Sequence, residues 1–372
     1  MPPSNLHILF VTGGSGGHIY PMLAVLDAVQ AQSPTTRCSY VGTAADMQSP
    51  AIRGRDQLEK YTIHTGKLHR FWTLKNAREF IGLGQGFLEA QRLIKRLQPD
   101  LIFAKGGAVS VPIVAAAARL GIPIFSHETD VRSGLANRFA ARFATTIFTA
   151  YPAENYPTIP LAKIYYVGQP IRPEFYIPAT ADIHADSRII AQDLPLITVI
   201  GGSQGAKGLN TLVVEHWSDY LQLAQLFHIC GPSDLEPLRM RAAKLTTAEQ
   251  QRLFLVAYQH DGLPAAFQRS RVVINRAGGT AIELAASRSA SVLVPLASAA
   301  QDHQRANAAV LLAAGAAMVV QESEGADALY TVVEKLFNNS EKQQRIRQNI
   351  SSFARAAAAK DIAAALLIST HE

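Results

Sequence analysis

The sequence predicts an α/β protein built from two domains with parallel sheets, and three observations support that prediction. Strand-like apolar runs alternate with helical patterns along most of the 372 residues. Two glycine-rich loops, Gly13–His18 and Gly201–Ala206, each directly follow an apolar run and open onto a helical pattern. One loop lies in each half of the chain, whose length suits two ordinary domains.

The first half predicts strands wherever a short, continuous apolar run occurs, because strands of a parallel sheet are buried on both faces. Longer amphipathic stretches predict the helices that cover the sheet, and Pro99 ends one of them. The expected strands are Ile8–Thr12, Cys38–Gly42, Leu101–Ala104, Ile122–Ser126, Thr146–Thr149 and Ile164–Val167, and the expected helices are Pro21–Gln32, Phe87–Leu97, Val109–Leu120 and Gly134–Phe143.

The alternation stops between Gly168 and Pro195, where prolines and a polar stretch predict a hinge or linker. Strands are then expected at Leu196–Ile200, Phe227–Cys230, Leu253–Val256, Arg271–Ile274 and Ser291–Pro295, and an Ala-rich helical tail over Ser340–Ile368. We therefore expect an N-terminal domain over 1–168, a linker over 169–195, a C-terminal domain over 196–340, and a tail over 341–372 that packs back on the body.

The composition excludes several classes of protein. With 48% hydrophobic and 17% charged residues the chain is expected to be globular. It has no apolar run long enough to span a membrane, and its N-terminus does not read as a secretory signal. Two distant cysteines indicate a reducing compartment, and no Cys/His spacing suits zinc. The net charge of +6 and the pI near 9.3 predict an anionic partner.

Glycines let a backbone approach a phosphate closely, and the following helix N-terminus offers N–H groups and a positive dipole end. Both loops therefore suit phosphate-bearing molecules. The first loop lacks the lysine of an ATP-hydrolysing P-loop. At its end, a neutral His18 has the chemistry to accept a proton from a hydroxyl, or it serves only to position the loop.

Two further groups of polar residues suit hydroxyl-bearing ligands. Glu283 follows Arg276–Thr280 on a predicted helix, where a carboxylate suits two ribose hydroxyls or is simply a solvated charge. His303, Gln304 and Asn307 share one helical face, and their donors and acceptors suit sugar hydroxyls unless they are ordinary surface residues.

These motifs resemble those of the MurG family, membrane-associated N-acetylglucosaminyltransferases of peptidoglycan assembly, over residues 6 to 340. The segments that carry the resemblance are Gly13–His18, His127-Glu128 running to Asn137, Gly168–Arg172, Gly201–Ala206, Arg276–Gly279, and Asp302–Gln304 with Asn307. The resemblance implies the GT-B fold, with two Rossmann-like domains whose parallel sheets face a cleft. It also implies inverting transfer of N-acetylglucosamine from UDP-N-acetylglucosamine to undecaprenyl-diphosphate-linked lipid I, giving lipid II.

The resemblance also implies site residues and partners. His18 would be the catalytic base, with no cofactor and no metal, and the missing Asp-x-Asp pattern agrees with a metal-free site. The acceptor diphosphate loop would comprise Gly14, Ser15, Gly16 and Gly17, and the donor-binding residues would be Arg172, Ser203, Gln204, Gly205, Glu283, His303, Gln304, Asn307 and Asp130.

Some residues depart from the family pattern. Thr129-Asp130 stands where the family commonly has Gln-Asn, Ala108 where an aromatic is frequent, and the spacing from Arg276 to Glu283 is one residue short. Two alternatives stay open: a UDP-N-acetylglucosamine 2-epimerase, which shares the fold and the donor, and a non-catalytic UDP-sugar-binding relative, which these departures motivate.

Residues 67–98 mix basic and apolar side chains, among them Arg70, Trp72, Arg78, Phe87 and Lys95. Such a mixture suits the interface of a membrane with anionic lipids, although burial of the apolar members would leave only a basic surface. We expect a peripheral protein on the cytoplasmic face of the plasma membrane that contacts anionic inner-leaflet lipids. Nucleic acid is not expected as a partner, because no recognition motif for it is present.

Overall fold

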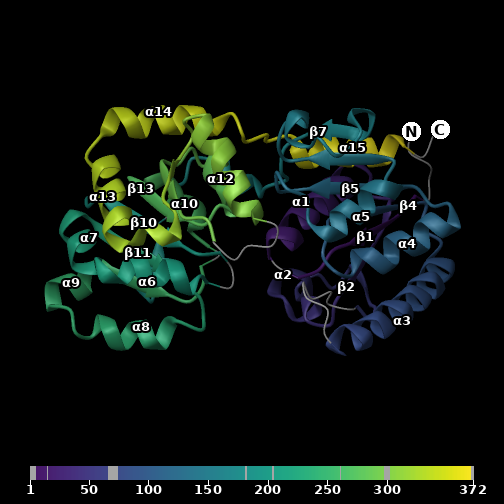
Figure 1. Cartoon of the computed structure of the whole chain (residues 1–372), viewed down its shortest axis with the longest axis horizontal. Coiled ribbons are helices and arrows are strands. Elements are labelled where there is room, and N and C mark those ends of the chain that lie inside the picture. The colour runs from purple at the N-terminus through teal and green to yellow at the C-terminus, as the bar shows by residue number, and fades with distance from the viewer. Residues whose placement is uncertain are drawn as a thin grey trace. The chain divides into compact units, whose positions relative to one another are not determined.

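The computed structural model describes residues 6–14, 16–65, 74–180, 182–202, 205–259, 261–296 and 302–369. Contacts divide the chain into two compact units. Unit 1 runs to Arg172 and regains the chain from Ala357 onward, and unit 2 is Pro173–Ala356. Figure 1 shows a sheet with its own covering helices in each unit.

Unit 1 contains a seven-stranded sheet in the order β3-β2-β1-β4-β5-β6-β7, and every neighbouring pair is parallel. Its strands are β1 (His7–Val11), β2 (Arg37–Gly42), β3 (Glu59–Thr62), β4 (Leu101–Ala104), β5 (Ile124–Glu128), β6 (Thr146–Thr149) and β7 (Ile164–Tyr166). Its helices are α1 (Gly16–Gln32), α2 (Pro50–Arg53), α3 (Leu74–Leu97), α4 (Ser110–Leu120), α5 (Leu135–Phe143) and α15 (Ala358–Ile368).

Unit 2 contains a six-stranded parallel sheet in the order β12-β11-β10-β13-β14-β15. Its strands are β10 (Leu196–Ile200), β11 (Gln225–Ile229), β12 (Leu253–Val256), β13 (Val272–Asn275), β14 (Ser291–Leu293) and β15 (Met318–Val319), with a separate hairpin of β8 (His184–Ala185) and β9 (Arg188–Ile189). Its helices are α6 (Lys207–Glu215), α7 (Trp217–Leu223), α8 (Leu235–Ala242), α9 (Thr247–Arg252), α10 (Leu263–Arg269), α11 (Thr280–Ala286), α12 (His303–Ala313), α13 (Gly325–Phe337) and α14 (Ser340–Ser351).

The two sheets share one strand order at their centres. β1 lies between β2 and β4, and β10 lies between β11 and β13. In each sheet the chain therefore first builds outward on one side of the central strand and then crosses to the other side. Open α/β sheets bind ligands at such a switch point, outside the carboxyl ends of the strands. Both glycine loops follow these central strands and so lie at the two switch points.

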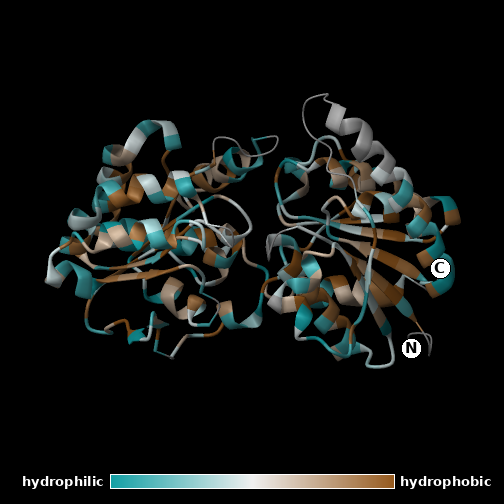
Figure 2. Ribbon diagram, turned by 90° about the horizontal axis from the view of Figure 1, so that it is seen from below, coloured by the Kyte–Doolittle hydropathy of each residue, from teal (hydrophilic) through white to brown (hydrophobic). Residues whose placement is uncertain are grey.

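The core strands are mostly apolar, and Figure 2 shows them as largely brown ribbons beneath helices of mixed hydropathy. Every residue of β1, β4, β10 and β13 is buried. The C-terminal helix α15 packs on α1 and contributes Ile362, Leu366 and Leu367 to the core of unit 1. Figure 1 shows α15 among the elements of unit 1, far in sequence from its neighbours.

Several element boundaries differ from those expected. Helix α1 begins at Gly16 rather than Pro21, so His18 lies in its first turn. The helical tail expected over Ser340–Ile368 consists of two helices, α14 and α15, and α14 contacts α11 and α13 of unit 2.

The stretch 169–195, expected as a hinge or linker, is not a free connection in the structure, since most of it belongs to unit 2. Phe175 is fully buried with its ring 5.9 Å from that of Phe267, and Ile183 and Ile190 are fully buried too.

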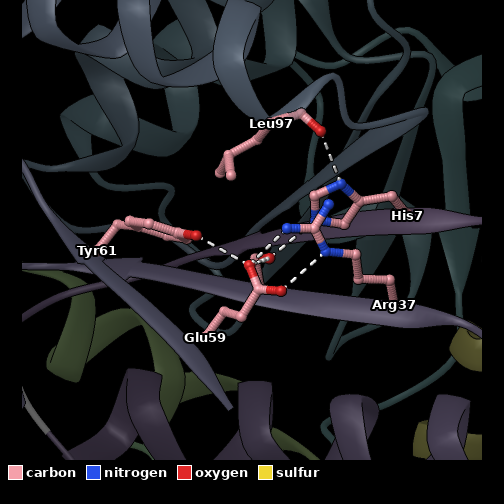
Figure 3. Close-up of polar contacts among 6 residues, drawn as sticks. His7, Arg37, Glu59, Tyr61 and Leu97 are labelled. Atoms are coloured by element: carbon pink, nitrogen blue, oxygen red, sulfur yellow. Dashed lines mark hydrogen bonds and ion pairs between the residues drawn. The ribbon is translucent and has the colours of Figure 1, made fainter.

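A polar cluster lies at the amino ends of β1, β2 and β3, opposite the glycine loop (Figure 3). Arg37 donates from Nε and Nη2 to both oxygens of Glu59, at 2.9 and 2.7 Å. The Arg37 hydrogen bond is the main cause that lowers the pKa of Glu59 to about 2. Ser39 links the pair to the imidazole of His7, which also contacts the Leu97 carbonyl. Because this edge of the sheet lies away from the switch point, we assign the cluster a role in stability.

Candidate functional site

The first glycine loop is held by a carboxylate that lies 32 residues away in sequence. Asp46, only 3% exposed, accepts hydrogen bonds from the Gly14 amide at 3.0 Å and from the Thr43 amide and hydroxyl, each at 2.7 Å. Gly14 has a φ of +110°, which L side chains rarely adopt, so glycine is needed there. Asp46 thus fixes the path of the loop just after β1.

A second glycine pair, Gly106-Gly107, follows β4 and touches this loop. A Cβ on Gly107 would lie 2.3 Å from the Gly13 carbonyl oxygen, so the two backbones are in direct contact. His18 Nδ1 lies 3.0 Å from the Lys105 carbonyl oxygen. A carbonyl can only accept, so Nδ1 carries the proton and Nε2 is the basic nitrogen of the neutral ring. The geometry suits His18 for the role of a base.

Next to His18 lies a buried group of ionisable side chains at the carboxyl ends of β4 and β5. Lys105 is fully buried, its ammonium donates to the Thr129 hydroxyl, and burial lowers its pKa to about 8. Glu128 accepts at 3.0 Å from both the Asp130 amide and Asn137 Nδ2. Burial raises the pKa of Glu128, and the neighbouring Asp130 adds to that rise. These bonds hold the 128–130 turn from two sides.

His127, also on β5, is fully buried, and its Nε2 lies 2.9 Å from the carbonyl oxygen of Gly168. Burial, helped by the positive charge of Lys105, lowers the pKa of His127 well below its ordinary value. The imidazole is therefore neutral at physiological pH. It ties β5 to the segment in which unit 1 ends rather than acting as a charged ligand.

The second glycine loop follows β10. Gly205 has a φ of +77°, and a Cβ there would lie 2.4 Å from the Cys230 carbonyl oxygen, so this position also requires glycine. Asn210 on α6 donates to that carbonyl at 2.8 Å and to Asp234 at 2.7 Å, and it accepts from His228 at 3.0 Å. This buried network holds the start of α6 against β11. Ser203 and Gln204 lie outside the described residues, as does Ser15 of the first loop.

The other expected donor residues gather at the carboxyl ends of β13 and β14. Asn307 on α12 is buried and donates to the Ala277 carbonyl at 3.0 Å, while Gln304 accepts from the Leu296 amide at 2.9 Å. Asn307 therefore braces the turn after β13, and Gln304 braces the segment after β14. Glu283 lies half-buried on α11, and His303 is the first residue of α12.

Arg172 and Asp130, which the resemblance placed with the donor, belong to unit 1. The Arg172 guanidinium lies over the Tyr20 ring, 5.5 Å from its centroid. Asp130 lies next to the Glu128 turn.

Two important residues were missed by the sequence analysis. Asp46 lies in a stretch without periodicity, and only its place in a turn after β2 could have drawn attention to it. Asn210 is one polar residue within an apolar helical pattern, which is a weak signal for a buried bracing residue.

The described residues contain no group of three or more His, Cys, Asp or Glu side chains arranged to hold a metal ion. None of the described helices combines the length and apolar character needed to cross a bilayer.

Comparison with known proteins places these sites in a family. Residues 8–149 match the glycosyltransferase family 28 N-terminal domain, and residues 196–363 match the glycosyltransferase family 28 C-terminal domain. The UDP-N-acetylglucosamine–N-acetylmuramyl-(pentapeptide) pyrophosphoryl-undecaprenol N-acetylglucosamine transferase 2 of Bacillus cereus is 33% identical over 92% of this chain and 99% of its own length. The UDP-N-acetylglucosamine–N-acetylmuramyl-(pentapeptide) pyrophosphoryl-undecaprenol N-acetylglucosamine transferase of Clostridium novyi is 32% identical over 94% of this chain and 95% of its own length.

Solved structures agree with this placement. The crystal structure of Acinetobacter baumannii MurG matches with a TM-score of 0.72 and 26% identity, over 97% of this chain and 99% of its own. A UDP-GlcNAc 2-epimerase from Neisseria meningitidis bound to UDP-GlcNAc has a TM-score of 0.68 but only 13% identity, over 97% of this chain and 100% of its own, so it shares the fold alone. The architecture is the two-domain GT-B fold, and the chain belongs to the MurG family of N-acetylglucosamine transferases.

Proposed function

We propose that this protein transfers N-acetylglucosamine from UDP-N-acetylglucosamine to the muramyl sugar of lipid I, the undecaprenyl-diphosphate-linked muramyl-peptide, and so makes lipid II. The observation that carries the proposal is the pair of glycine loops at equivalent switch points of two sheets, in a member of this family. Each loop suits one diphosphate: that of the lipid acceptor in the N-terminal domain (1–168) and that of the nucleotide donor in the C-terminal domain (196–340).

The proposed reaction forms a bond from the acceptor hydroxyl to the anomeric carbon as the bond from that carbon to the UDP oxygen breaks. His18 takes the hydroxyl proton on Nε2, since its Nδ1 donates to the Lys105 carbonyl. The acceptor diphosphate lies against Gly14, Ser15, Gly16 and Gly17. Negative charge grows on the leaving UDP, and the amides and dipole at the start of α6 stabilise it.

Donor recognition is assigned mainly to residues of unit 2, with Arg172 and Asp130 added from unit 1. Ser203, Gln204 and Gly205 line the diphosphate loop, Glu283 accepts from the ribose hydroxyls, and His303 and Gln304 contact the sugar. Asn307 acts through the turn that it holds, because its amide group donates to Ala277. Arg172 contributes positive charge toward UDP, and Asp130 contributes a polar contact.

The transferase proposal is tested with a short-chain lipid I analogue and labelled UDP-N-acetylglucosamine. A disaccharide product identified by mass spectrometry is expected. The variant His18→Ala should lower turnover by about 10²-fold or more. UDP affinity and the unfolding temperature should stay unchanged in that variant. Near-normal turnover of His18→Ala would remove His18 from the base role, and the absence of any disaccharide from the wild-type protein would refute the transferase.

The epimerase alternative has less support. The epimerase structure that matches shares only 13% identity, whereas the transferases from Bacillus cereus and Clostridium novyi are 33% and 32% identical over most of their length. Conversion of UDP-N-acetylglucosamine to its 2-epimer without an acceptor would favour that alternative instead.

Peripheral contact with anionic lipids of the cytoplasmic leaflet is the second part of the proposal. Much of the stretch 67–98 that suggested it lies outside the described residues or has undescribed side chains; of the rest, Leu88, Arg92 and Lys95 are exposed and Leu93 is buried. A second surface supports the contact better. This α5 surface comprises Leu135, Phe139, Arg138, Arg142 and Lys163, which line a hollow of about 710 Å³, and the exposed apolar Phe143 and Leu161.

On the α5 surface, Leu135 and Leu161 are 62% and 72% exposed, and Arg138 and Arg142 are exposed one helical turn apart. Apolar side chains that reach the acyl boundary beside cations that face headgroups are what an interfacial site requires. Such a contact would bring the enzyme to a lipid-linked acceptor.

The membrane proposal is tested by flotation with vesicles of phosphatidylglycerol and phosphatidylcholine. Wild-type protein should float, and Arg138→Glu with Arg142→Glu should abolish flotation. The control pair Lys342→Glu with Arg345→Glu changes the same charge on exposed positions of α14 in unit 2 and should float like wild type. Flotation of the α5 pair at the wild-type level would refute a role for this surface.

A further inference from the structure

A basic residue lies beside the second glycine loop and is not explained by the packing of unit 2. In the β10–β13 ladder Ile200 pairs with Asn275, the last residue of β13. The next residue, Arg276, therefore stands level with Gly201, where the glycine loop begins. Arg276 thus lies at the switch point of unit 2.

The Arg276 side chain is only 4% exposed, and its hydrogen bonds use only one of its three nitrogens. Nη1 donates to the Val294 carbonyl at 2.9 Å and to Glu322 at 3.1 Å. Nε and Nη2 are buried and have no hydrogen-bond partner among the described residues, and the same holds for the amide of Asn275. Buried charged donors without partners are costly, so their presence indicates a missing anionic partner.

Nε and Nη2 form one edge of the guanidinium, the edge that grips two oxygens at once. Arg37 uses the same two nitrogens in this protein to bind both oxygens of Glu59, at 2.9 and 2.7 Å. In Arg276 this edge is the one left without a partner. Its fork geometry matches a carboxylate or a phosphate.

Gly208 places this edge at the first turn of α6. A Cβ on Gly208 would lie 1.6 Å from Glu322 Oε1 and 3.1 Å from Arg276 Nη2. The carboxylate and the guanidinium therefore pack directly against the helix backbone, in space that only glycine leaves. Helix α6 has nine residues and no side-chain cap at its N-terminus. The N–H groups of α6 and Arg276 thus gather positive charge at one place.

We infer that Arg276 binds the diphosphate of the nucleotide donor through its Nε and Nη2 edge, and that Glu322 is a positioning residue that holds the opposite edge. The inference rests on the proposed function and adds to it the residue that meets charge on the departing UDP. As the bond to the sugar breaks, the electron pair goes to the UDP oxygen, and a preorganised guanidinium stabilises it without reorganisation.

The equivalent position in unit 1 behaves differently. Ala104 pairs with Val11, so Lys105 follows β4 as Arg276 follows β13. The Lys105 ammonium is fully buried and donates to Thr129. Of these two equivalent cations, Arg276 is therefore the one with buried N–H donors that an anion can accept from.

The test compares the affinities of UDP and uridine by calorimetry, because their difference isolates the diphosphate. Arg276→Met should lower the affinity for UDP by about 30-fold, within the range for a charge-assisted hydrogen bond, and leave the affinity for uridine unchanged. The control Arg347→Met removes another partly buried arginine of unit 2, one that donates to the Ser270 carbonyl at 2.7 Å, and should leave both affinities unchanged. Arg276→Lys should recover part of the UDP affinity.

The outcomes separate this inference from the proposed function. If the wild-type protein binds UDP and Arg276→Met binds it equally well, the inference is wrong while the donor assignment stands. Equal losses for UDP and uridine would also overturn the inference, since they indicate damage to the whole site. Failure of the wild-type protein to bind UDP would overturn the donor assignment itself.

Gly208→Ala gives a second measurement that leaves the Arg276 residue itself unmutated, in case Arg276→Met does not fold. The new Cβ would displace the Glu322 carboxylate and should lower the affinity for UDP but not the affinity for uridine. Unchanged UDP affinity in Gly208→Ala would argue against Glu322 as the positioning residue.

Discussion

The contact between the two loops of unit 1 can be broken by one methyl group. In Gly107→Ala the new Cβ would lie 2.3 Å from the Gly13 carbonyl oxygen, and an ordinary contact begins near 3.4 Å. The neighbour is backbone, so the two loops must part by about 1 Å. A shift of about 1 Å in a catalytic arrangement can reduce the rate by about 10²-fold. The left-handed backbone, with a φ of +85°, adds a stability cost of about 1–2 kcal/mol for alanine.

The assay for Gly107→Ala is kcat/KM for the lipid I analogue at saturating donor, together with UDP affinity and thermal unfolding. We expect acceptor kcat/KM to fall by about 10²-fold with UDP affinity unchanged, because the donor loop lies in unit 2. Gly121→Ala is the matched control: its φ is +72°, but its Cβ would meet nothing within 4 Å. It should show the stability cost with normal kcat/KM. Wild-type acceptor kinetics in Gly107→Ala would refute the reasoning.

Three further predictions concern a pH effect, the C-terminal helix and the first loop. Burial lowers the pKa of His216, but the hydrogen bonds of its imidazole to Asp219 and Asp327 outweigh burial, so the pKa is raised. The contribution of His216 to the free energy of unfolding is therefore full below about pH 6.5 and is lost as the pH rises through the raised pKa. His216→Gln should therefore destabilise the protein more at about pH 6 than at about pH 8.5 in urea unfolding, by about 0.5–1 kcal/mol, and an equal loss at both would contradict this. Leu366→Ala empties a fully buried site of α15 and should cost about 2–5 kcal/mol of unfolding free energy, so a loss below about 1 kcal/mol would show that α15 is not needed by unit 1. Asp46→Asn removes the charged acceptor of the first loop and should raise the KM for the lipid analogue by about tenfold without changing UDP affinity. An unchanged KM would show that acceptor binding does not depend on the hydrogen bond from Gly14 to Asp46.

The core of the fold was predictable because most of its strands are short, mostly apolar runs in the sequence. Leu196–Ile200 was predicted to the residue, and β1 to within one residue at each end. The strand β3 was missed because Glu59–Thr62 is a partly exposed edge strand that carries charged residues. The strand β15 was missed because it has only two residues, which leave no periodicity to detect.

The site was predictable where glycine or a motif marks it, and not where it depends on long-range packing. The loops after β1 and β10 were found because glycine follows a strand at both places. Asp46 and Glu322 carry no such mark: each reaches its partner from a separate element, and only the folded chain brings the pair together. The same reason explains why Arg276 was identified as part of a motif but not as a buried cation with two unpartnered donors.

The most direct test of the account is UDP release from UDP-N-acetylglucosamine, measured with and without the short-chain lipid I analogue. A family member with separate donor and acceptor loops should release UDP only when the analogue is present, one UDP for each disaccharide formed. Release of UDP at the same rate without the analogue, or tight UDP binding with no acceptor-dependent release, would contradict the central claim that the two loops serve two substrates of one transfer reaction.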